Sequence, residues 1–167
     1  MADRIPGESF FRENYFTAGM NTLVERCFRH LGGSTAGSSV FLLSQAMGGG
    51  KTHSMVALGL MARDPVLRKK VLGSQDPSPS LGKVKVIGFN GRNVEPALGV
   101  WGSLAEQLGR RDHFKSYYQP LSAPGPQAWK ELLDGQPVIL LLDELPPYME
   151  NARSVQIGNS DLSVVTA

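Results

Sequence analysis

Gly48-Gly49-Gly50-Lys51-Thr52-His53 is the stretch that decides the predicted fold. It follows the apolar run Val40-Phe41-Leu42-Leu43 and precedes an apolar-periodic segment that starts near Met55. A strand, a glycine-rich turn and a helix in this order are the context of a phosphate-binding loop. Glycine lacks Cβ, so such a loop turns successive N–H groups toward an anion, and the next helix adds its positive N-terminal end. The stretch therefore predicts a Walker A loop between a strand at residues 39–44 and a helix.

The residues of this loop have predicted roles toward a nucleotide. Lys51 is expected to reach the β- and γ-phosphates and to serve catalysis, and the Thr52 hydroxyl is expected to ligate Mg²⁺. The residues expected to contact the nucleotide are Met47, Gly48, Gly49, Gly50, Lys51, Thr52 and His53. The usual pattern G-x-x-x-x-G-K-[ST] would have a glycine where this chain has Gln45. Two alternatives stay open: the stretch is a glycine-rich turn with a chance Gly-Lys-Thr, and His53 is a packed or solvent-facing side chain.

Composition limits the classes of protein that the chain can represent. Its 167 residues are 41% apolar, enough for one domain with a core, and its net charge of +2 gives no electrostatic case for strong DNA binding. The single cysteine, Cys27, excludes an intrachain disulfide and suits a reducing compartment. Residues 1–8 lack the apolar core of a signal peptide, and no apolar run reaches membrane-spanning length. These features predict a cytoplasmic protein without a membrane partner, and they leave a DNA contact open.

Helical and strand patterns alternate along the chain. A helix is predicted after Thr17 as N-cap, and another after the glycine loop until Pro65 breaks it. Further helices are predicted at 97–109 and 127–133, and further strands at 83–89 and 138–142. This order predicts an α/β fold of the three-layer P-loop NTPase type, with a parallel sheet that lacks its C-terminal strands.

Two parts of the chain are predicted to differ in role. Residues 1–34 are expected to form an N-terminal arm and a helix, and residues 35–167 the truncated ATPase core. Within the arm, Tyr15 and Phe16 either stack on adenine or plug the sheet with apolar surface.

A second motif follows the last apolar strand, Val138–Leu142, in the form of the acidic pair Asp143-Glu144. An apolar strand that ends in such a pair is typical of a Walker B motif. Ligands bind at the carboxyl ends of parallel strands, so the glycine loop and the acidic pair are expected at the same edge of the sheet. Asp143 is expected to hold Mg²⁺, and Glu144 to be catalytic by polarising the attacking water. A glutamate after the aspartate favours ATP hydrolysis, because GTPases more often show Asp-x-x-Gly there.

Two basic features of the sequence have a structural interpretation beside or in place of a ligand-binding one. Arg92, after the second predicted strand, is expected to touch a γ-phosphate or DNA, or else to make structural hydrogen bonds. The cluster Arg68-Lys69-Lys70 is expected to complement a helix dipole.

Several motifs together resemble the AAA-type ATPases of domain-of-unknown-function family 499. They are residues 15–20 (YFTAGM), 44–53 (SQAMGGGKTH), 91–93 (GRN), 101–105 (WGSLA) and 141–148 (LLDELPPY). The resemblance implies that Gln45 is the family's own variant of the loop. It also implies ATP and Mg²⁺ as ligands, and a large prokaryotic protein associated with DNA-modification or phage-defence systems. It further implies protein partners or a homo-oligomer.

The resemblance also implies a sensor residue, an arginine finger and further strands, so the chain is expected to be the N-terminal piece of a longer protein. A second hypothesis is a nucleotide-dependent interaction module, or an inactive fragment, without turnover. A third is a P-loop kinase, which is disfavoured because Arg153 is the only arginine after Asp143.

Overall fold

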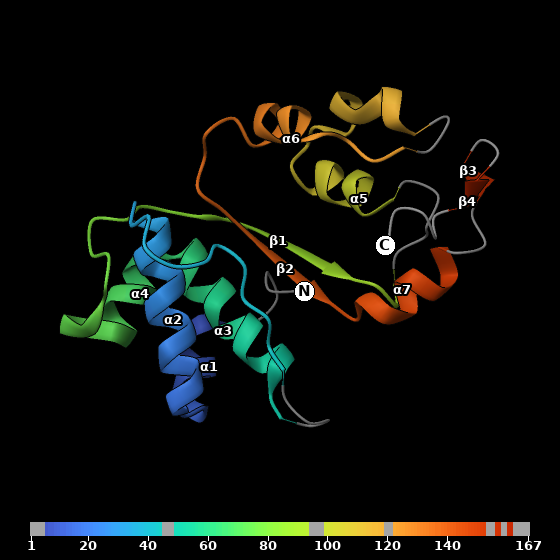
Figure 1. The fold of residues 1–167 in the computed structure, drawn as a ribbon. Helices are drawn as coiled ribbons and strands as arrows, with labels where there is room; N and C mark the ends of the chain where they lie inside the picture. The colour runs from blue at the N-terminus through green and yellow to red at the C-terminus, as the bar shows by residue number, and fades with distance from the viewer. Residues whose placement is uncertain are drawn as a thin grey trace. The chain divides into compact units, whose positions relative to one another are not determined.

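The computed structural model describes residues 6–44, 49–93, 99–118, 122–152, 156–157 and 160–161. The chain divides into two compact units, Met1–Val86 and Ile87–Ala167. Each unit contains its own helices, and strand β1 begins just before the division (Figure 1). The boundary that the sequence predicts after residue 34 divides an N-terminal arm and helix from an ATPase core. It stays a prediction.

Over the described part of the first unit, the regular elements that precede β1 are helical. Its elements are α1 (Gly7–Glu13), α2 (Ala18–Leu31), α3 (Lys51–Arg63), α4 (Pro65–Leu72) and a 3-10 turn (Gly73–Gln75). The predicted helix after Thr17 is confirmed, because the Thr17 side chain accepts a hydrogen bond from the Met20 N–H at 3.2 Å. The apolar face of α2 is buried at Met20, Leu23, Val24, Cys27 and Phe28. Burial raises the pKa of the Cys27 thiol to about 11, so the thiol stays protonated at neutral pH.

The predicted helix after the glycine loop is also confirmed. α3 is buried on all sides in its second half, from Ala57 to Ala62, as expected for a helix without a polar face. It ends at Arg63, and the Asp64 side chain caps α4 by accepting the N–H groups of Val66 and Leu67, both at 3.0 Å. Pro65 therefore both ends one helix and opens the next, a position where its missing N–H costs nothing.

The strand predicted at residues 39–44 is wrong. Residues 40–44 form no regular element, and Val40 and Leu42 are 78% and 90% exposed. The Ser38 hydroxyl bonds to both backbone groups of Val40, accepting its N–H at 3.0 Å and donating to its carbonyl at 2.9 Å. Such local bonds offer the backbone an alternative to a strand ladder, so the apolar run stays outside any described sheet.

The sequence of residues 1–16 suggests a loop or arm without a helix, and this is wrong in part, because α1 occupies Gly7–Glu13. This helix contacts α3 and α4. Lys70 Nζ lies 2.8 Å from Glu8 Oε1, and a Cβ on Gly7 would lie 2.4 Å from Leu67 Cδ2. Packing against two neighbouring helices, which no local pattern reports, therefore supports a seven-residue helix.

The second unit combines helices with short strands. Its elements are β1 (Lys85–Asn90), α5 (Gly99–Gln107), a 3-10 segment (Arg111–Tyr117), α6 (Pro126–Leu133), β2 (Val138–Asp143), α7 (Leu145–Ala152), β3 (Gln156–Ile157) and β4 (Ser160–Asp161). β1 and β2 form a two-stranded parallel sheet, and their arrows run the same way in Figure 1. β3 and β4 pair antiparallel. The core of this unit contains Ile87, Phe89, Trp101, Leu104, Ala105, Phe114, Leu132 and Tyr148.

The predicted strands at 83–89 and 138–142 are confirmed within two residues, as are the helices at 97–109 and 127–133. The continuous apolar run of β2 predicts a strand that is buried on both faces, and this expectation is wrong. Ile139 is buried, but Leu140 and Leu142 are each 40% exposed, so the strand is not buried on both faces. The described chain is a mixed α/β protein, and the three-layer P-loop architecture stays a prediction. Among the described helices, none has the length and apolarity that crossing a membrane requires.

Candidate functional site

The candidate site has two halves, each with its own geometry. Lys51 and Thr52 belong to the first unit, and Asp143 and Glu144 belong to the second. The positions of the two units relative to one another are not determined (Figure 1).

The first half is the glycine turn at the start of α3. Gly50 caps the helix with φ 78°, in the left-handed region that glycine adopts at no steric cost. Its carbonyl accepts the Ser54 N–H at 2.9 Å and the Ser54 hydroxyl at 3.1 Å. Lys51 and Thr52 are the first two residues of the 13-residue helix. The N–H groups of a first helical turn have no partner within the helix and carry partial positive charge, so this end of α3 suits an anion.

The accessible side chain in this turn is that of Thr52, which is exposed, whereas Lys51 is half-buried. A hydroxyl on the first turn offers the oxygen that Mg²⁺ prefers, and an ammonium offers a phosphate a point charge. The predicted contacts of Met47 and Gly48 lie outside the described residues. The roles predicted for Gly49, Gly50, Lys51 and Thr52 are compatible with this geometry and stay predictions.

His53 makes a packing contact. Its ring stacks on Phe10 of α1, with centroids 4.7 Å apart and planes at 25°. This contact supports the packing alternative and ties the first turn of α3 to α1. The predicted nucleotide contact of His53 stays untested.

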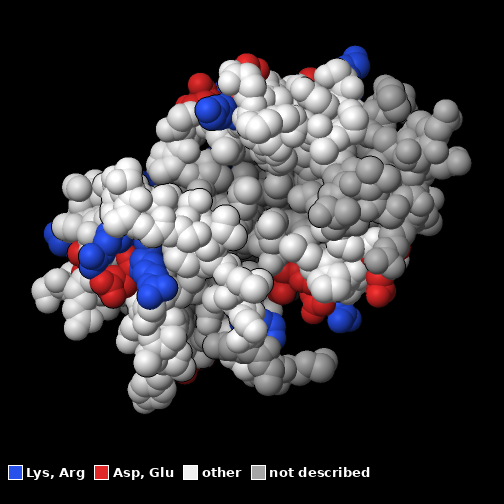
Figure 2. Space-filling model, viewed as in Figure 1, with Lys and Arg blue, Asp and Glu red and all other residues white. Residues whose placement is uncertain are grey.

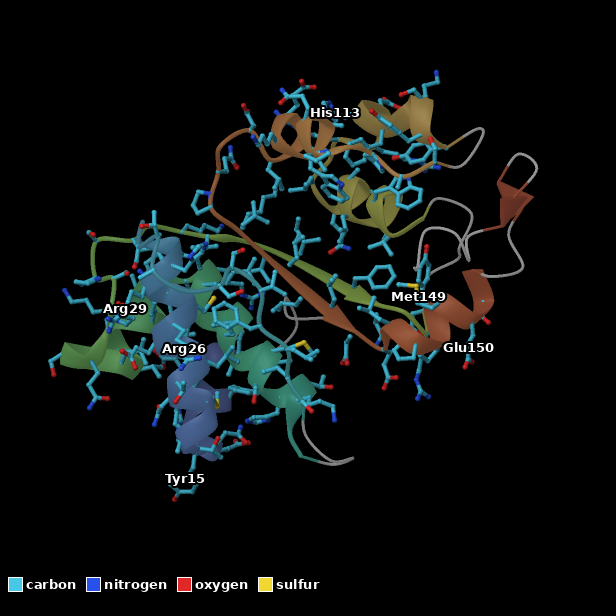
Figure 3. The ribbon with its side chains drawn as sticks, viewed as in Figure 1. Tyr15, Arg26, Arg29, His113, Met149 and Glu150 are labelled. Atoms are coloured by element: carbon cyan, nitrogen blue, oxygen red, sulfur yellow. The ribbon has the colours of Figure 1, made fainter. Side chains whose placement is uncertain are left out.

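The two arm aromatics differ in exposure. Tyr15 is 94% exposed, and Figure 3 shows its side chain pointing away from the helices. Phe16 is half-buried and stacks on Phe11, with centroids 5.7 Å apart. The aromatic contact of Phe16 is therefore made within the arm, and both predicted roles, adenine stacking and a plug against the sheet, stay predictions.

The second half of the site is the acidic pair at the carboxyl end of β2. Asp143 is the last residue of the strand, and Glu144 has φ 53°, which is uncommon for a residue with a side chain. The Glu144 N–H donates to the Asp143 carboxylate at 3.1 Å. Such a conformation costs about 1–3 kcal/mol and persists only where the surroundings impose it. Here the turn directs the chain from β2 into α7.

Gly91, just beyond β1, imposes part of this conformation. Its N–H donates to the Asp143 carbonyl at 2.9 Å, which extends the pairing of the two strands. A Cβ on Gly91 would lie 2.0 Å from the Glu144 carbonyl oxygen and 2.8 Å from Tyr148 Cβ. The close backbone approach that fixes the Glu144 turn is therefore available only to glycine.

Gly91→Ala is expected to lower the free energy of unfolding by about 1–3 kcal/mol, the range for overpacking. The new Cβ would meet the Glu144 carbonyl oxygen, and this backbone atom cannot move aside as a flexible side chain would. Gly88→Ala is the matched control on β1, because a Cβ there meets nothing within 4 Å. Urea unfolding of both variants checks this, and equal stability of the two would contradict the role given to Gly91.

Arg92 faces the acidic pair. Its Nε lies 3.3 Å from Glu144 Oε2, and its N–H donates to the Asn90 side-chain oxygen at 3.0 Å. The sequence singled out Arg92 but named phosphate, DNA or structural bonds as its partners. The pairing with Glu144 was missed because residues 92 and 144 meet only through the pairing of β1 with β2. The role of Asn90 in shaping the turn was also missed, although Asn-Gly is a turn dipeptide and an asparagine side chain commonly accepts the N–H two residues further on.

A preformed cluster of metal ligands is not part of either half. Across the described ranges, no group of three or more His, Cys, Asp or Glu side chains could hold a metal ion. The predicted Mg²⁺ ligands Thr52 and Asp143 are both oxygen donors, which fits an ion that is also held by substrate phosphates. On the face in Figure 2, described lysines and arginines lie in small groups beside aspartates and glutamates, which offers DNA no broad basic surface there.

The described chain is a mixed α/β protein. It has a glycine turn before a helix and an acidic pair at the end of a parallel strand. The model of the DUF499 N-terminal domain matches residues 5–81 and 83–161. The chain therefore belongs to this family, as its motifs indicated. Neither the curated proteins nor the solved structures contain a match to it.

Proposed function

We propose that this chain is the ATP-binding and ATP-hydrolysing module of a larger prokaryotic AAA-type ATPase, which acts in a DNA-modification or phage-defence system. The observation that carries the proposal is the position of Lys51 and Thr52 as the first residues of α3, directly after the left-handed Gly50. The strand-borne pair Asp143-Glu144 adds the acidic groups that hydrolysis needs.

In the proposed reaction, the α3 N-terminus and Lys51 bind the phosphates of ATP. Thr52 and Asp143 would hold Mg²⁺, which neutralises charge on the phosphates when it is bound. Glu144 accepts a proton from a water molecule, whose oxygen forms a bond to the γ-phosphorus while the bond to the β-phosphate oxygen breaks. The products are ADP and inorganic phosphate. The proposal requires both halves of the site to reach one nucleotide.

Lys51→Ala is expected to weaken ATP binding by about 10- to 100-fold, because a charge-assisted bond to phosphate is lost from a half-buried ammonium. Calorimetric titration with ATP and Mg²⁺ measures the change. Lys69→Ala is the matched control, since Lys69 is an exposed lysine in α4 of the same unit. Equal affinity of Lys51→Ala and the wild-type chain would contradict the proposed site.

A second candidate is a nucleotide-dependent interaction module that does not turn ATP over. The observation that favours it is the ion pair between Glu144 and Arg92, because it engages the carboxylate that hydrolysis would need. Phosphate release measured beside the titration separates the two candidates. Lys51-dependent binding without phosphate release would favour the interaction module.

A further inference from the structure

In the part of the chain that the structure describes, β1 has a strand neighbour on one side, which is β2 (Figure 1). The other side of β1 is an edge, and the N–H and C=O groups of a sheet edge are a template on which a further strand can add. The Gly91 N–H, directly after β1, donates to the Asp143 carbonyl of β2. Because successive residues of a strand direct these groups to opposite sides, those of Gly88 face the outer edge.

Gln107, the last residue of α5, covers this edge at Gly88. Its side-chain oxygen accepts the Gly88 N–H at 3.2 Å, and its Nε2 donates to the Gly88 carbonyl at 2.7 Å. One side-chain amide thus makes both hydrogen bonds that a residue of an antiparallel neighbouring strand would make. Nε2 also lies 3.4 Å from the Ser103 carbonyl, one turn earlier on α5, which helps to hold the amide in place.

The contact between Gly88 and Gln107 is accessible from solvent, because both residues are exposed. A Cβ on Gly88 would meet nothing within 4 Å, so the strand is uncrowded at this point. Further along the same edge, the Asn90 carbonyl accepts the Asn93 N–H at 3.0 Å and is thus engaged within the chain. The Gln107 amide is therefore the group that an incoming strand would have to displace at Gly88.

We infer that Gln107 protects the outer edge of β1 from pairing with β1 of a second copy of this chain. A second copy fits this edge, because Gly88 can lie opposite its own equivalent across a two-fold axis. Directly opposite residues of an antiparallel pair exchange both N–H···O bonds, and Gly88 offers one donor and one acceptor on the same side. Two glycines also bring no side chains into conflict there. Rotation of the Gln107 amide away from Gly88 exposes the pairing surface, and this mechanism does not depend on nucleotide binding.

Gln107→Ala is the direct test, because it removes the covering amide. Sedimentation equilibrium of the whole chain should show self-association about tenfold stronger than that of the wild type, in keeping with the two backbone groups that become available. Gln107→Glu should associate no more than the wild type, since its carboxylate still accepts the Gly88 N–H and a charge at a sheet edge disfavours pairing. Equal association of Gln107→Ala and the wild-type chain would overturn the inference.

Gln127→Ala is the matched control for this substitution. Gln127 is an exposed glutamine on α6 of the same unit, and its Nε2 donates to Glu131 Oε1 at 3.0 Å. Its loss should leave self-association unchanged, because this amide does not cover a strand. Stronger association of Gln127→Ala, to the extent seen for Gln107→Ala, would show that loss of a surface amide suffices and would overturn the role given to Gln107.

Gly88→Pro, added to Gln107→Ala, shows whether the new contact uses β1. Proline has no N–H to donate, and an edge strand tolerates it where that N–H faces outward. The double variant should return to the association of the wild-type chain. Association that persists in the double variant would use another surface and would contradict pairing through β1.

Hydrogen exchange at the Gly88 N–H gives a second measurement, which reports on the protection within one copy. In dilute Gln107→Ala, this N–H should exchange at least about fivefold faster than in the wild type, because its acceptor is gone. At high concentration the exchange should slow again as the second copy supplies an acceptor. Alanine favours the helix at this position, so circular dichroism should match the wild type. Exchange at Gly88 that is unchanged at both concentrations would show that Gln107 does not protect this edge.

Discussion

Glu144→Gln is expected to lower phosphate release from ATP by about 100- to 10,000-fold, the contribution of a positioned general base. Glutamine keeps the size of the side chain, but it cannot accept the proton of the attacking water. ATP should remain bound at least as tightly as by the wild-type chain, because the substitution removes a negative charge near the proposed phosphate position. Calorimetry and single-turnover phosphate release measure the two effects separately.

Glu150→Gln is the matched control for this prediction. Glu150 is an exposed glutamate on α7, six residues after Glu144, and is labelled in Figure 3. Its loss should leave both binding and phosphate release unchanged. Hydrolysis by Glu144→Gln at the wild-type rate would show that Glu144 is not the base, even if the chain is an ATPase.

Local sequence patterns correctly predicted those helices and strands whose own residues favour the observed structure. α2 has a threonine that caps it and an apolar stripe that one face can bury, and both are visible in the sequence. β2 is a continuous apolar run, and the parallel sheet placed the acidic pair at its carboxyl end as expected. The candidate residues Lys51, Thr52, Asp143 and Glu144 were named from these local patterns, and their roles stay predictions.

Other features depend on contacts that no local pattern reports. The run at 40–43 has the apolar character of a strand, but bonds from the Ser38 hydroxyl satisfy Val40 instead. The partner of Arg92 follows from strand pairing across about fifty residues of chain. Arg68 is the clearest case, because its place in a basic cluster predicted a role toward a helix dipole, whereas its side chain is 1% exposed and paired with Asp76.

Arg68 is expected to be the most important charged residue for the stability of the first unit. Its Nε lies 3.1 Å from Asp76 Oδ2, with the two side chains 1% and 3% exposed. The guanidinium also donates to the Leu81 carbonyl and lies 5.1 Å from the centre of the Phe28 ring. It thus joins α4, α2 and the segment after the 3-10 turn.

Arg68→Met should lower the free energy of unfolding by about 3–5 kcal/mol, because it leaves the Asp76 carboxylate buried without its partner. Urea unfolding followed by circular dichroism measures the loss. Arg29→Met is the matched control on α2, where Arg29 pairs with Glu25 four residues earlier and both side chains are more than half exposed (Figure 3). That change should cost at most about 0.5 kcal/mol.

The double variant Arg68→Met with Asp76→Asn separates the charge from the packing. An asparagine retains an oxygen that can accept the Ser78 N–H, which the Asp76 carboxylate now accepts at 3.0 Å. Because no unpaired charge remains, the double variant should be more stable than Arg68→Met alone. If the double variant were no more stable than Arg68→Met, loss of packing around the Arg68 stem, and not the stranded carboxylate, would account for the cost of Arg68→Met. If Arg68→Met cost no more than Arg29→Met, the buried pair would not stabilise this unit at all.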